Sequence, residues 1–158
     1  MVNALRAVCA ALLLCLVAVP AIASDGPGAL HWLEGRWRGA GTMLGNASEA
    51  VLEVRPALSG RFTELSYRAA GFEGRAFYRP VGDGRWQATW FDNRGVSFGI
   101  EALLSERVLT SDWGSADSER GRTIYRLLPD GRLEVTDSVA AAGGAMREFA
   151  RHVLEKAD

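Results

Sequence analysis

Apolar and polar residues alternate over most of the chain beyond residue 35, in short segments separated by turn residues. A period of two is typical of β-strands that bury one face. Tight hairpin turns are indicated by Gly82-Asp83-Gly84 and Asp130-Gly131, where glycine permits the positive φ that such turns need. The pattern predicts ten strands, at residues 36–44, 49–56, 61–69, 73–80, 85–91, 96–104, 107–113, 122–128, 132–139 and 145–155.

These strands predict an all-β fold. Short hairpin connections make neighbours in sequence neighbours in the sheet, which gives an up-and-down antiparallel meander. A sheet of about ten strands curls, and closing it into a barrel removes the exposed edges. We therefore expect an up-and-down antiparallel β-barrel, preceded by a short helix over residues 28–34.

The alternation also predicts which side chains face the barrel interior, because the more apolar set of each strand should turn inward. Such a lining of aromatic and apolar groups, with a few phenol and indole donors, suits a small-molecule cavity. The alternative is that the same side chains simply fill the barrel. The expected ligand-binding residues are Leu65, Tyr67, Tyr78, Trp86, Trp90, Phe98 and Tyr125, with Ile100 and Leu127 also facing inward.

The first 23 residues read as a signal peptide. Arg6 is followed by an apolar run over residues 7–19, which is too short to span a membrane, and Ala21-Ile22-Ala23 fits a cleavage site. We expect cleavage near Ala23, a periplasmic or secreted protein, and a single barrel domain over residues 24–158.

Composition narrows the functional classes. Both cysteines, Cys9 and Cys15, lie in the predicted leader, so the mature domain has no thiol for a disulfide, a nucleophile or a thiolate metal site. Without Arg6, 17 basic residues face 19 acidic ones, a net charge of −2. No basic stripe of the kind needed for nucleic-acid binding is present, and no membrane span is expected in the mature chain.

Signs of catalysis are weak. The chain has no Gly-x-Ser-x-Gly, nucleotide-binding, His-Glu-x-x-His or EF-hand pattern. Asp112 and Asp137 are polar strand positions whose facing the pattern leaves open. His152, which shares a face of the last strand with Ala150 and Leu154, is a candidate metal ligand or an ordinary strand histidine. No catalytic residues are assigned.

One segment supports a resemblance. Leu33-Glu34-Gly35-Arg36-Trp37-Arg38-Gly39-Ala40-Gly41 resembles the opening of calycin-like barrels, in particular nitrobindin-like and other bacterial lipocalin-like domains. Ser59-Gly60-Arg61-Phe62 and Trp90-Phe91-Asp92-Asn93-Arg94-Gly95 look like later signatures of the same group. The resemblance covers most of residues 29–156 and is specific for the barrel rather than for an activity.

The resemblance implies roles for residues near the two ends of the domain. Gly35 and Trp37 would plug the closed end of the barrel, with Arg151 or Arg147 from the last strand stacked on the indole as a cation–π partner. Nitrobindin-like proteins bind haem through a last-strand histidine and handle reactive nitrogen species, and only His152 matches that ligand. Because Arg151 and His152 are adjacent on a strand, one must face inward and the other outward.

Three functions follow from these observations. The first is an exported β-barrel that binds a small apolar molecule in its interior, without catalysis or cofactor. The second is haem binding through His152, with chemistry on reactive nitrogen species. The third is a structural or partner-binding envelope protein with a filled barrel.

Overall fold

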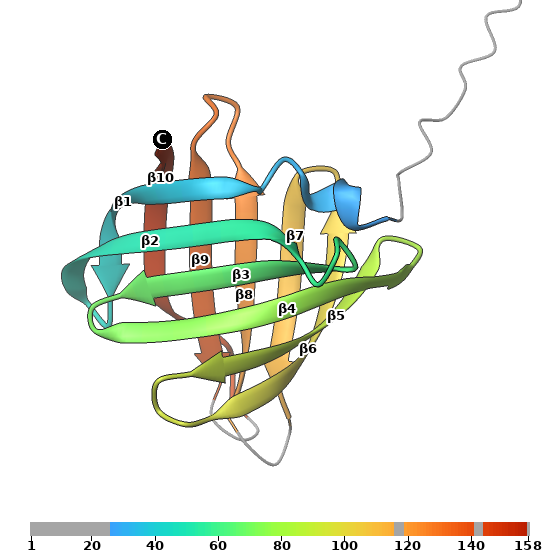
Figure 1. Ribbon diagram of the computed structural model, residues 1–158. Coiled ribbons are helices and arrows are strands. Elements are labelled where there is room, and N and C mark those ends of the chain that lie inside the picture. Colours follow the sequence, from blue (N-terminus) through green and yellow to red (C-terminus); the bar gives the residue numbers. More distant parts are fainter. Residues whose placement is uncertain (1–25, 116–118, 141–143, 158) are drawn as a thin grey trace, which may run out of the picture.

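The computed structural model describes residues 26–115, 119–140 and 144–157. The predicted signal peptide, residues 1–23, lies outside these ranges. The described chain forms one closed antiparallel barrel of ten strands (Figure 1). The strands are β1 (Gly35–Met43), β2 (Asn46–Ala57), β3 (Phe62–Ala69), β4 (Phe72–Gly82), β5 (Arg85–Asp92), β6 (Ser97–Ser105), β7 (Val108–Gly114), β8 (Arg120–Leu127), β9 (Leu133–Ala140) and β10 (Arg147–Ala157).

The predicted all-β barrel is confirmed, and each predicted strand has a counterpart whose bounds differ by no more than three residues. Before the first strand, a single 3-10 turn (η1) covers Pro27–Leu30, within and just ahead of the segment for which a short helix is predicted. Among the residues that the structure describes, no helix has the length and apolar character needed to cross a bilayer.

Every strand pairs with its neighbours in sequence, and β10 closes the barrel by pairing with β1. In Figure 1, β1 to β6 run across the four strands β7 to β10, which gives the barrel two distinct ends. The β1–β2, β3–β4 and β5–β6 hairpins lie at one end, which we call the mouth. The turn η1 and the start of β1 lie at the other, which we call the closed end.

The seam between β1 and β10 depends on two glycines. A Cβ atom added at Gly39 would overlap the backbone of Val153 and Leu154, and one added at Gly41 would overlap the backbone of Arg151 and His152. Only glycine lets two strands approach this closely. The repeated glycines after Trp37 are therefore explained by barrel closure.

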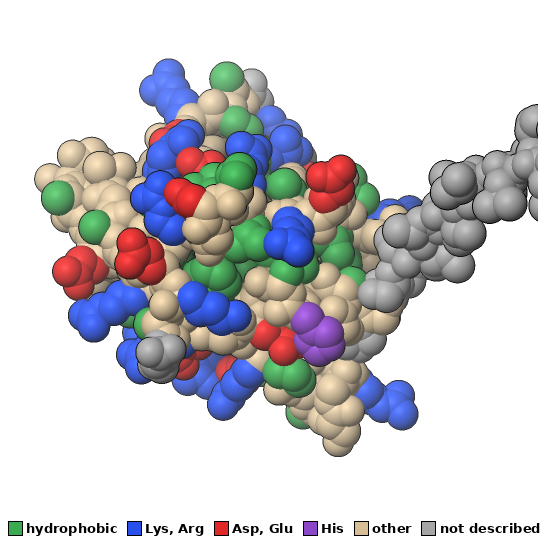
Figure 2. All heavy atoms as spheres, turned by 90° about the horizontal axis from the view of Figure 1, so that it is seen from above, with side chains coloured by type: hydrophobic (Ala, Val, Ile, Leu, Met, Phe, Trp, Pro, Cys, Tyr) green, Lys and Arg blue, Asp and Glu red, His purple; other side chains and the backbone are tan. Residues whose placement is uncertain are grey.

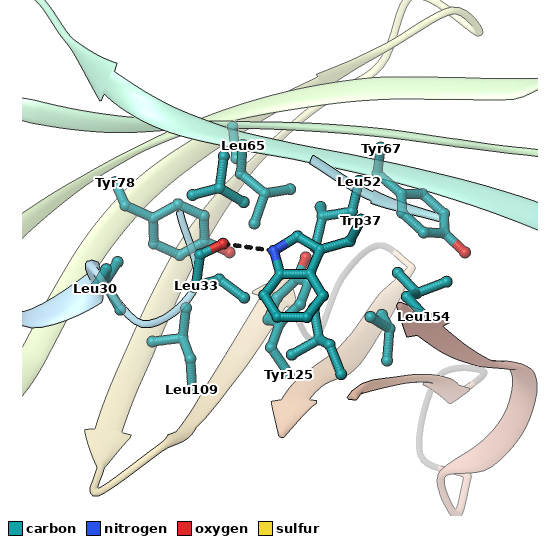
Figure 3. Close-up of a cluster of buried hydrophobic side chains, with 14 of the residues drawn as sticks. Leu30, Leu33, Trp37, Leu52, Leu65, Tyr67, Tyr78, Leu109, Tyr125 and Leu154 are labelled. Carbon is teal, nitrogen blue, oxygen red and sulfur yellow. Dashed lines mark hydrogen bonds between the residues drawn. The ribbon is translucent and has the colours of Figure 1, made fainter. Parts of the chain in front are cut away.

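The closed end is packed around Trp37, which is 2 % exposed. Its indole Nε1–H donates to the carbonyl oxygen of Leu33 at 2.8 Å, which ties β1 to the segment that follows η1 (Figure 3). Gly35, at the start of β1, has a φ of 114°, a conformation that favours glycine. The surrounding buried leucines are Leu30, Leu33, Leu52, Leu65, Leu109, Leu133 and Leu154.

The prediction that Arg151 or Arg147 stacks on Trp37 is wrong, because a lysine takes that place. Lys156 Nζ lies 5.3 Å from the centre of the indole ring. Arg151 instead points outward, where it is exposed and pairs with Glu148 and Glu134 at 2.8 and 2.9 Å. Because side chains alternate along a strand, the outward position of Arg151 turns His152 into the interior, where it is 0 % exposed.

Charged residues cover the outer wall. Figure 2 shows Lys and Arg interspersed with Asp and Glu on one face of the molecule. Several of these residues form cross-strand ion pairs, such as Arg122 with Asp112 at 2.6 Å. Glu64, a buried acid on this wall, is held by Arg55 and Arg75 at 2.8 and 3.5 Å. The polar side of each strand therefore faces outward, as the alternation predicts.

Candidate ligand-binding cavity

The half of the barrel next to the mouth is hollow. It contains a cavity of about 540 Å³, bounded by inward-facing side chains of the sheet and by the hairpin ends at the mouth. This volume lies within the range of small-molecule sites, about 300–1,000 Å³. The aromatic residues that line it are Tyr67, Phe72, Tyr78, Trp90, Phe98, Trp113, Tyr125 and Phe149.

The structure divides the seven expected ligand-binding residues between two regions. All seven face the interior. Leu65 and Trp86, each 1 % exposed, lie in the packed core and do not line the cavity. The five that line it are Tyr67, Tyr78, Trp90, Phe98 and Tyr125.

Two indoles lie flat against the inner wall because glycines leave room for them. A Cβ atom at Gly74 would overlap the six-membered ring of Trp90, and one at Gly121 would overlap that of Trp113. Trp90 is stacked on Phe72, with ring centres 6.0 Å apart. These pairings press the rings to the wall and leave the middle of the barrel open.

Hydroxyl groups mark the boundary between cavity and packed core. The Tyr78 hydroxyl lies 3.0 Å from Ser111 Oγ, and burial raises the pKa of Tyr78 to about 12. Burial also raises the pKa values of Tyr67 and Tyr125. All three phenols are therefore neutral at physiological pH and can donate or accept a hydrogen bond.

A buried carboxyl group, Asp137 on β9, lies among these hydroxyls. It is 9 % exposed and lines the cavity. Thr123 Oγ1–H donates to its Oδ1 at 2.6 Å, and Trp113 Nε1–H donates to the same threonine oxygen at 3.2 Å. Burial raises the pKa of Asp137 to about 6, against the smaller lowering effect of the Thr123 hydrogen bond. The carboxyl group is thus mainly ionised at pH 7, and it can accept a hydrogen bond or a proton.

His152 lies behind the cavity wall rather than on it. Its Nε2 is 2.6 Å from Ser48 Oγ and its Nδ1 is 3.1 Å from the Tyr67 hydroxyl. Burial lowers the pKa of His152, so the neutral imidazole is favoured, with one nitrogen donating and the other accepting. The ring fixes the positions of two cavity-lining side chains.

The surroundings of His152 do not fit a haem ligand. Both ring nitrogens already have a partner within hydrogen-bond distance, and the ring is absent from the residues that line the cavity. Coordination to iron would require Ser48 or Tyr67 to swing away and a buried partner to be lost. Nor do the described residues contain a group of three or more His, Asp or Glu side chains able to hold a metal ion.

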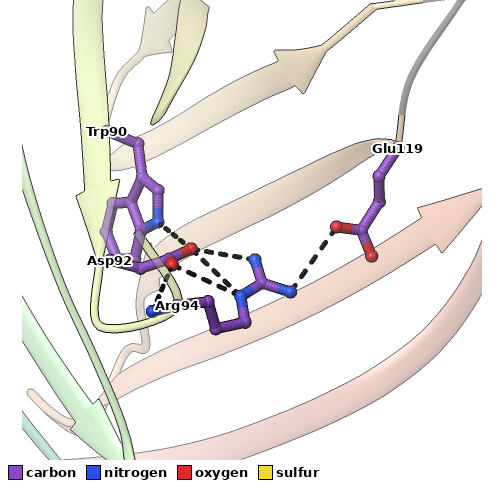
Figure 4. Close-up of polar contacts among 4 residues, drawn as sticks. All are labelled: Trp90, Asp92, Arg94 and Glu119. Atoms are coloured by element: carbon purple, nitrogen blue, oxygen red, sulfur yellow. Dashed lines mark hydrogen bonds and ion pairs between the residues drawn. The ribbon is translucent and has the colours of Figure 1, made fainter. Parts of the chain in front are cut away.

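An arginine spans part of the mouth. Arg94, from the β5–β6 hairpin, pairs with Asp92 at 2.8 Å and reaches Glu119 at 3.7 Å, ahead of β8 (Figure 4). Its guanidinium also lies 5.4 Å from the centre of the Phe72 ring. Trp90 Nε1–H donates to Asp92 at 3.3 Å, which connects this charged cluster to the aromatic wall. The positive charge at the mouth is therefore neutralised by two carboxylates.

Sequence reasoning missed several of these residues. The facing of Asp137 is open in the sequence, although Val135 and Val139, two positions before and after it, mark the inward face of β9. The facing of His152, which shares a face with Ala150 and Leu154, stays open in the sequence because the two sides of the last strand are similarly mixed. The roles of Ser111 and Thr123 have no signal in the sequence, because small hydroxyl residues occur on both faces of strands.

A scan against protein-family models finds no match, and a search of curated proteins finds no similar sequence. The chemistry of the cavity is therefore the basis for assigning a function. The cavity offers a large aromatic surface, three neutral phenols and the buried carboxyl group of Asp137, with Arg94 and Glu119 at its mouth, on the wall of a closed sheet.

Proposed function

We propose that this protein binds a small, largely apolar molecule inside its barrel. The observation behind this proposal is the cavity of about 540 Å³ lined by eight aromatic side chains, with polar groups gathered at its inner boundary. Such sites take up a ligand by burying its apolar body and fix its orientation through a few polar contacts.

The build of the wall supports ligand binding rather than a filled barrel. Interiors of proteins are normally packed to the density of organic crystals, so an unfilled space of this size is costly unless something occupies it. The glycines beneath Trp90 and Trp113 keep those rings at the wall, and the closed sheet surrounds the space. A preformed cavity lowers the entropic cost of binding.

We also propose a family likeness for the barrel and a place where the protein acts. The barrel is calycin-like, in keeping with its closed up-and-down topology and the Gly35-x-Trp37 plug at its closed end. The protein acts after export, to the periplasm or the medium, since its first 23 residues read as a cleavable leader. The mass of the protein recovered after expression with the full leader tests this point: a start at Ser24 is expected, and an intact N-terminus would contradict export.

Binding can be tested with a neutral apolar fluorophore, N-phenylnaphthylamine, titrated into the purified barrel. We expect saturable fluorescence enhancement with one site per chain. The variant Val139→Trp places an indole in the cavity and should lower the affinity about tenfold or more, because the probe and the new ring compete for one volume.

The matched control is Ser138→Trp, one residue earlier on β9. Ser138 pairs with Arg122 on the outer wall, so its side chain points away from the cavity. This variant should bind the fluorophore as the unmodified protein does. No saturable binding to the unmodified protein, or equal loss in both variants, would contradict an interior binding site.

A further inference from the structure

We infer that the ligand carries a protonated amine, and that Asp137 is the residue that binds it. This inference rests on the proposed function and adds the chemical class of the ligand. The inference starts from the carboxyl group of Asp137, which is only 9 % exposed and lies on the wall of an aromatic cavity.

The buried carboxyl group of Asp137 has no basic partner among the described residues. Among the described residues, Thr123 is the one hydrogen-bond partner of Asp137, and the bond reaches only Oδ1. Within residues 26–115, 119–140 and 144–157, no basic side chain forms an ion pair with Asp137, and burial is the main cause that raises its pKa. A buried carboxylate without a counter-charge is costly, and natural proteins normally pair such a group. A cation supplied by the ligand would complete the pair through Oδ2.

Neither His152 nor Arg94 can supply that counter-charge. His152 is held as a neutral ring between Ser48 and Tyr67. Arg94 lies at the mouth, where Asp92 and Glu119 already balance it. The interior is therefore negative overall, which disfavours fatty acids and other anionic ligands and favours cations.

The cavity wall that carries Asp137 is largely aromatic. Tyr67, Tyr78 and Tyr125 line the same cavity as Asp137, and Tyr125 lies on β8 two residues from Thr123, the residue paired with Asp137. Ring faces attract a desolvated cation, so carboxylate and rings act on an ammonium group together. An apolar body attached to that group would extend toward Phe98 and Trp90, nearer the mouth.

Three probes with one ring system test the inference by calorimetry at about pH 7.5: naphthylethylamine, naphthylethanol and naphthylacetate. The unmodified protein should bind the amine roughly 30-fold more tightly than the alcohol, and the acid most weakly. In Asp137→Asn the amine should lose this advantage, while binding of the alcohol stays unchanged and shows that the cavity is intact. Asp112→Asn, on the outer wall, is the matched control and should retain the preference for the amine.

A measurement on the unmodified protein covers the case in which Asp137→Asn does not fold. Below about pH 6, Asp137 becomes protonated, and the preference for the amine over the alcohol should disappear. Tyr67 and Tyr78 keep their protons in this range, and burial lowers the pKa of His152. Thr123 on β8 contacts Asp137, and the titratable groups of the same cavity and its wall are Tyr67 on β3, Tyr78 on β4, Tyr125 on β8, His152 on β10, and Arg94 and Glu119 at the mouth.

The outcomes separate the two proposals. If the alcohol binds as tightly as the amine, or if Asp137→Asn keeps the amine preference, the inference is overturned and interior binding stands. If none of the three probes binds and N-phenylnaphthylamine does not bind either, the proposed function fails and the inference fails with it.

Discussion

Side chains alternate between inside and outside at both ends of the barrel, but the interior is packed at the closed end and hollow near the mouth. At the closed end, leucines interlock beneath Trp37 and leave that part of the interior packed. Toward the mouth, aromatic rings lie against the wall over Gly74 and Gly121, and the middle stays open. The comparison teaches that alternation decides which residues face inward, whereas the shape and support of those residues decide whether the interior is filled.

The largest change should come from removing the centre of the closed end. Trp37→Ala deletes a buried indole and its hydrogen bond to Leu33, so we expect a loss of about 3–5 kcal/mol in the free energy of unfolding. The remaining folded protein should still bind N-phenylnaphthylamine with unchanged affinity, because Trp37 does not line the cavity. Denaturant unfolding and fluorophore titration of one sample check both points. A stable variant that no longer binds would show that the two ends are not independent.

A substitution in the hollow half, Asp137→Asn, should instead raise the free energy of unfolding. The pKa of Asp137 is raised from 3.8 to about 6 in the folded state, so folding stability falls as the pH rises through this interval and stays lower above it. Asp137→Asn should therefore stabilise the protein at pH 7 by up to about 2–3 kcal/mol and show no gain near pH 3. Urea unfolding at several pH values measures the difference. A variant less stable than the unmodified protein at pH 7 would contradict a net cost of the buried charge.

The smallest expected effect concerns the cation that lies over Trp37 at the closed end. Lys156→Gln removes the cation above the Trp37 ring and should cost about 0.5–1 kcal/mol, because the lysine is exposed. Arg151→Gln, which lies on the outer wall in the same strand, serves as the comparison and should change stability by no more than a surface ion pair does. Thermal unfolding of the two variants tests this, and a larger loss for Arg151→Gln would restore the arginine as the important cation.

The strands could be predicted from sequence because alternation and turn residues are local signals. The facing of the last strand could not, since its two sides are similarly mixed. A bulge adds to the difficulty: the register of β10 shifts between Glu148 and Ala150, so that Phe149 lines the cavity although its neighbour Ala150 is buried as well. Strict alternation would have turned one of these two side chains outward.

The cavity itself was predicted only as a set of inward residues. Whether Leu65 and Tyr67, two positions apart on β3, belong to core or cavity depends on depth along the barrel axis, which is fixed by the pairing of all ten strands. The partners of Asp137 are likewise nonlocal, since Thr123 lies on the adjacent strand. Contacts of this kind follow from register, which a single sequence does not display.

The glycine seam also determines when the protein can finish folding. The pairing of β1 with β10 also brings Ser48 on β2 and His152 on β10 together, from positions 104 residues apart. Until β10 is in place, the sheet has open edges. Ring closure is thus the step with the greatest loop-closure entropy, and slow folding is expected of such nonlocal topologies. A chain truncated before residue 147 would lack β10 and leave β1 and β9 as unpaired edges prone to self-association.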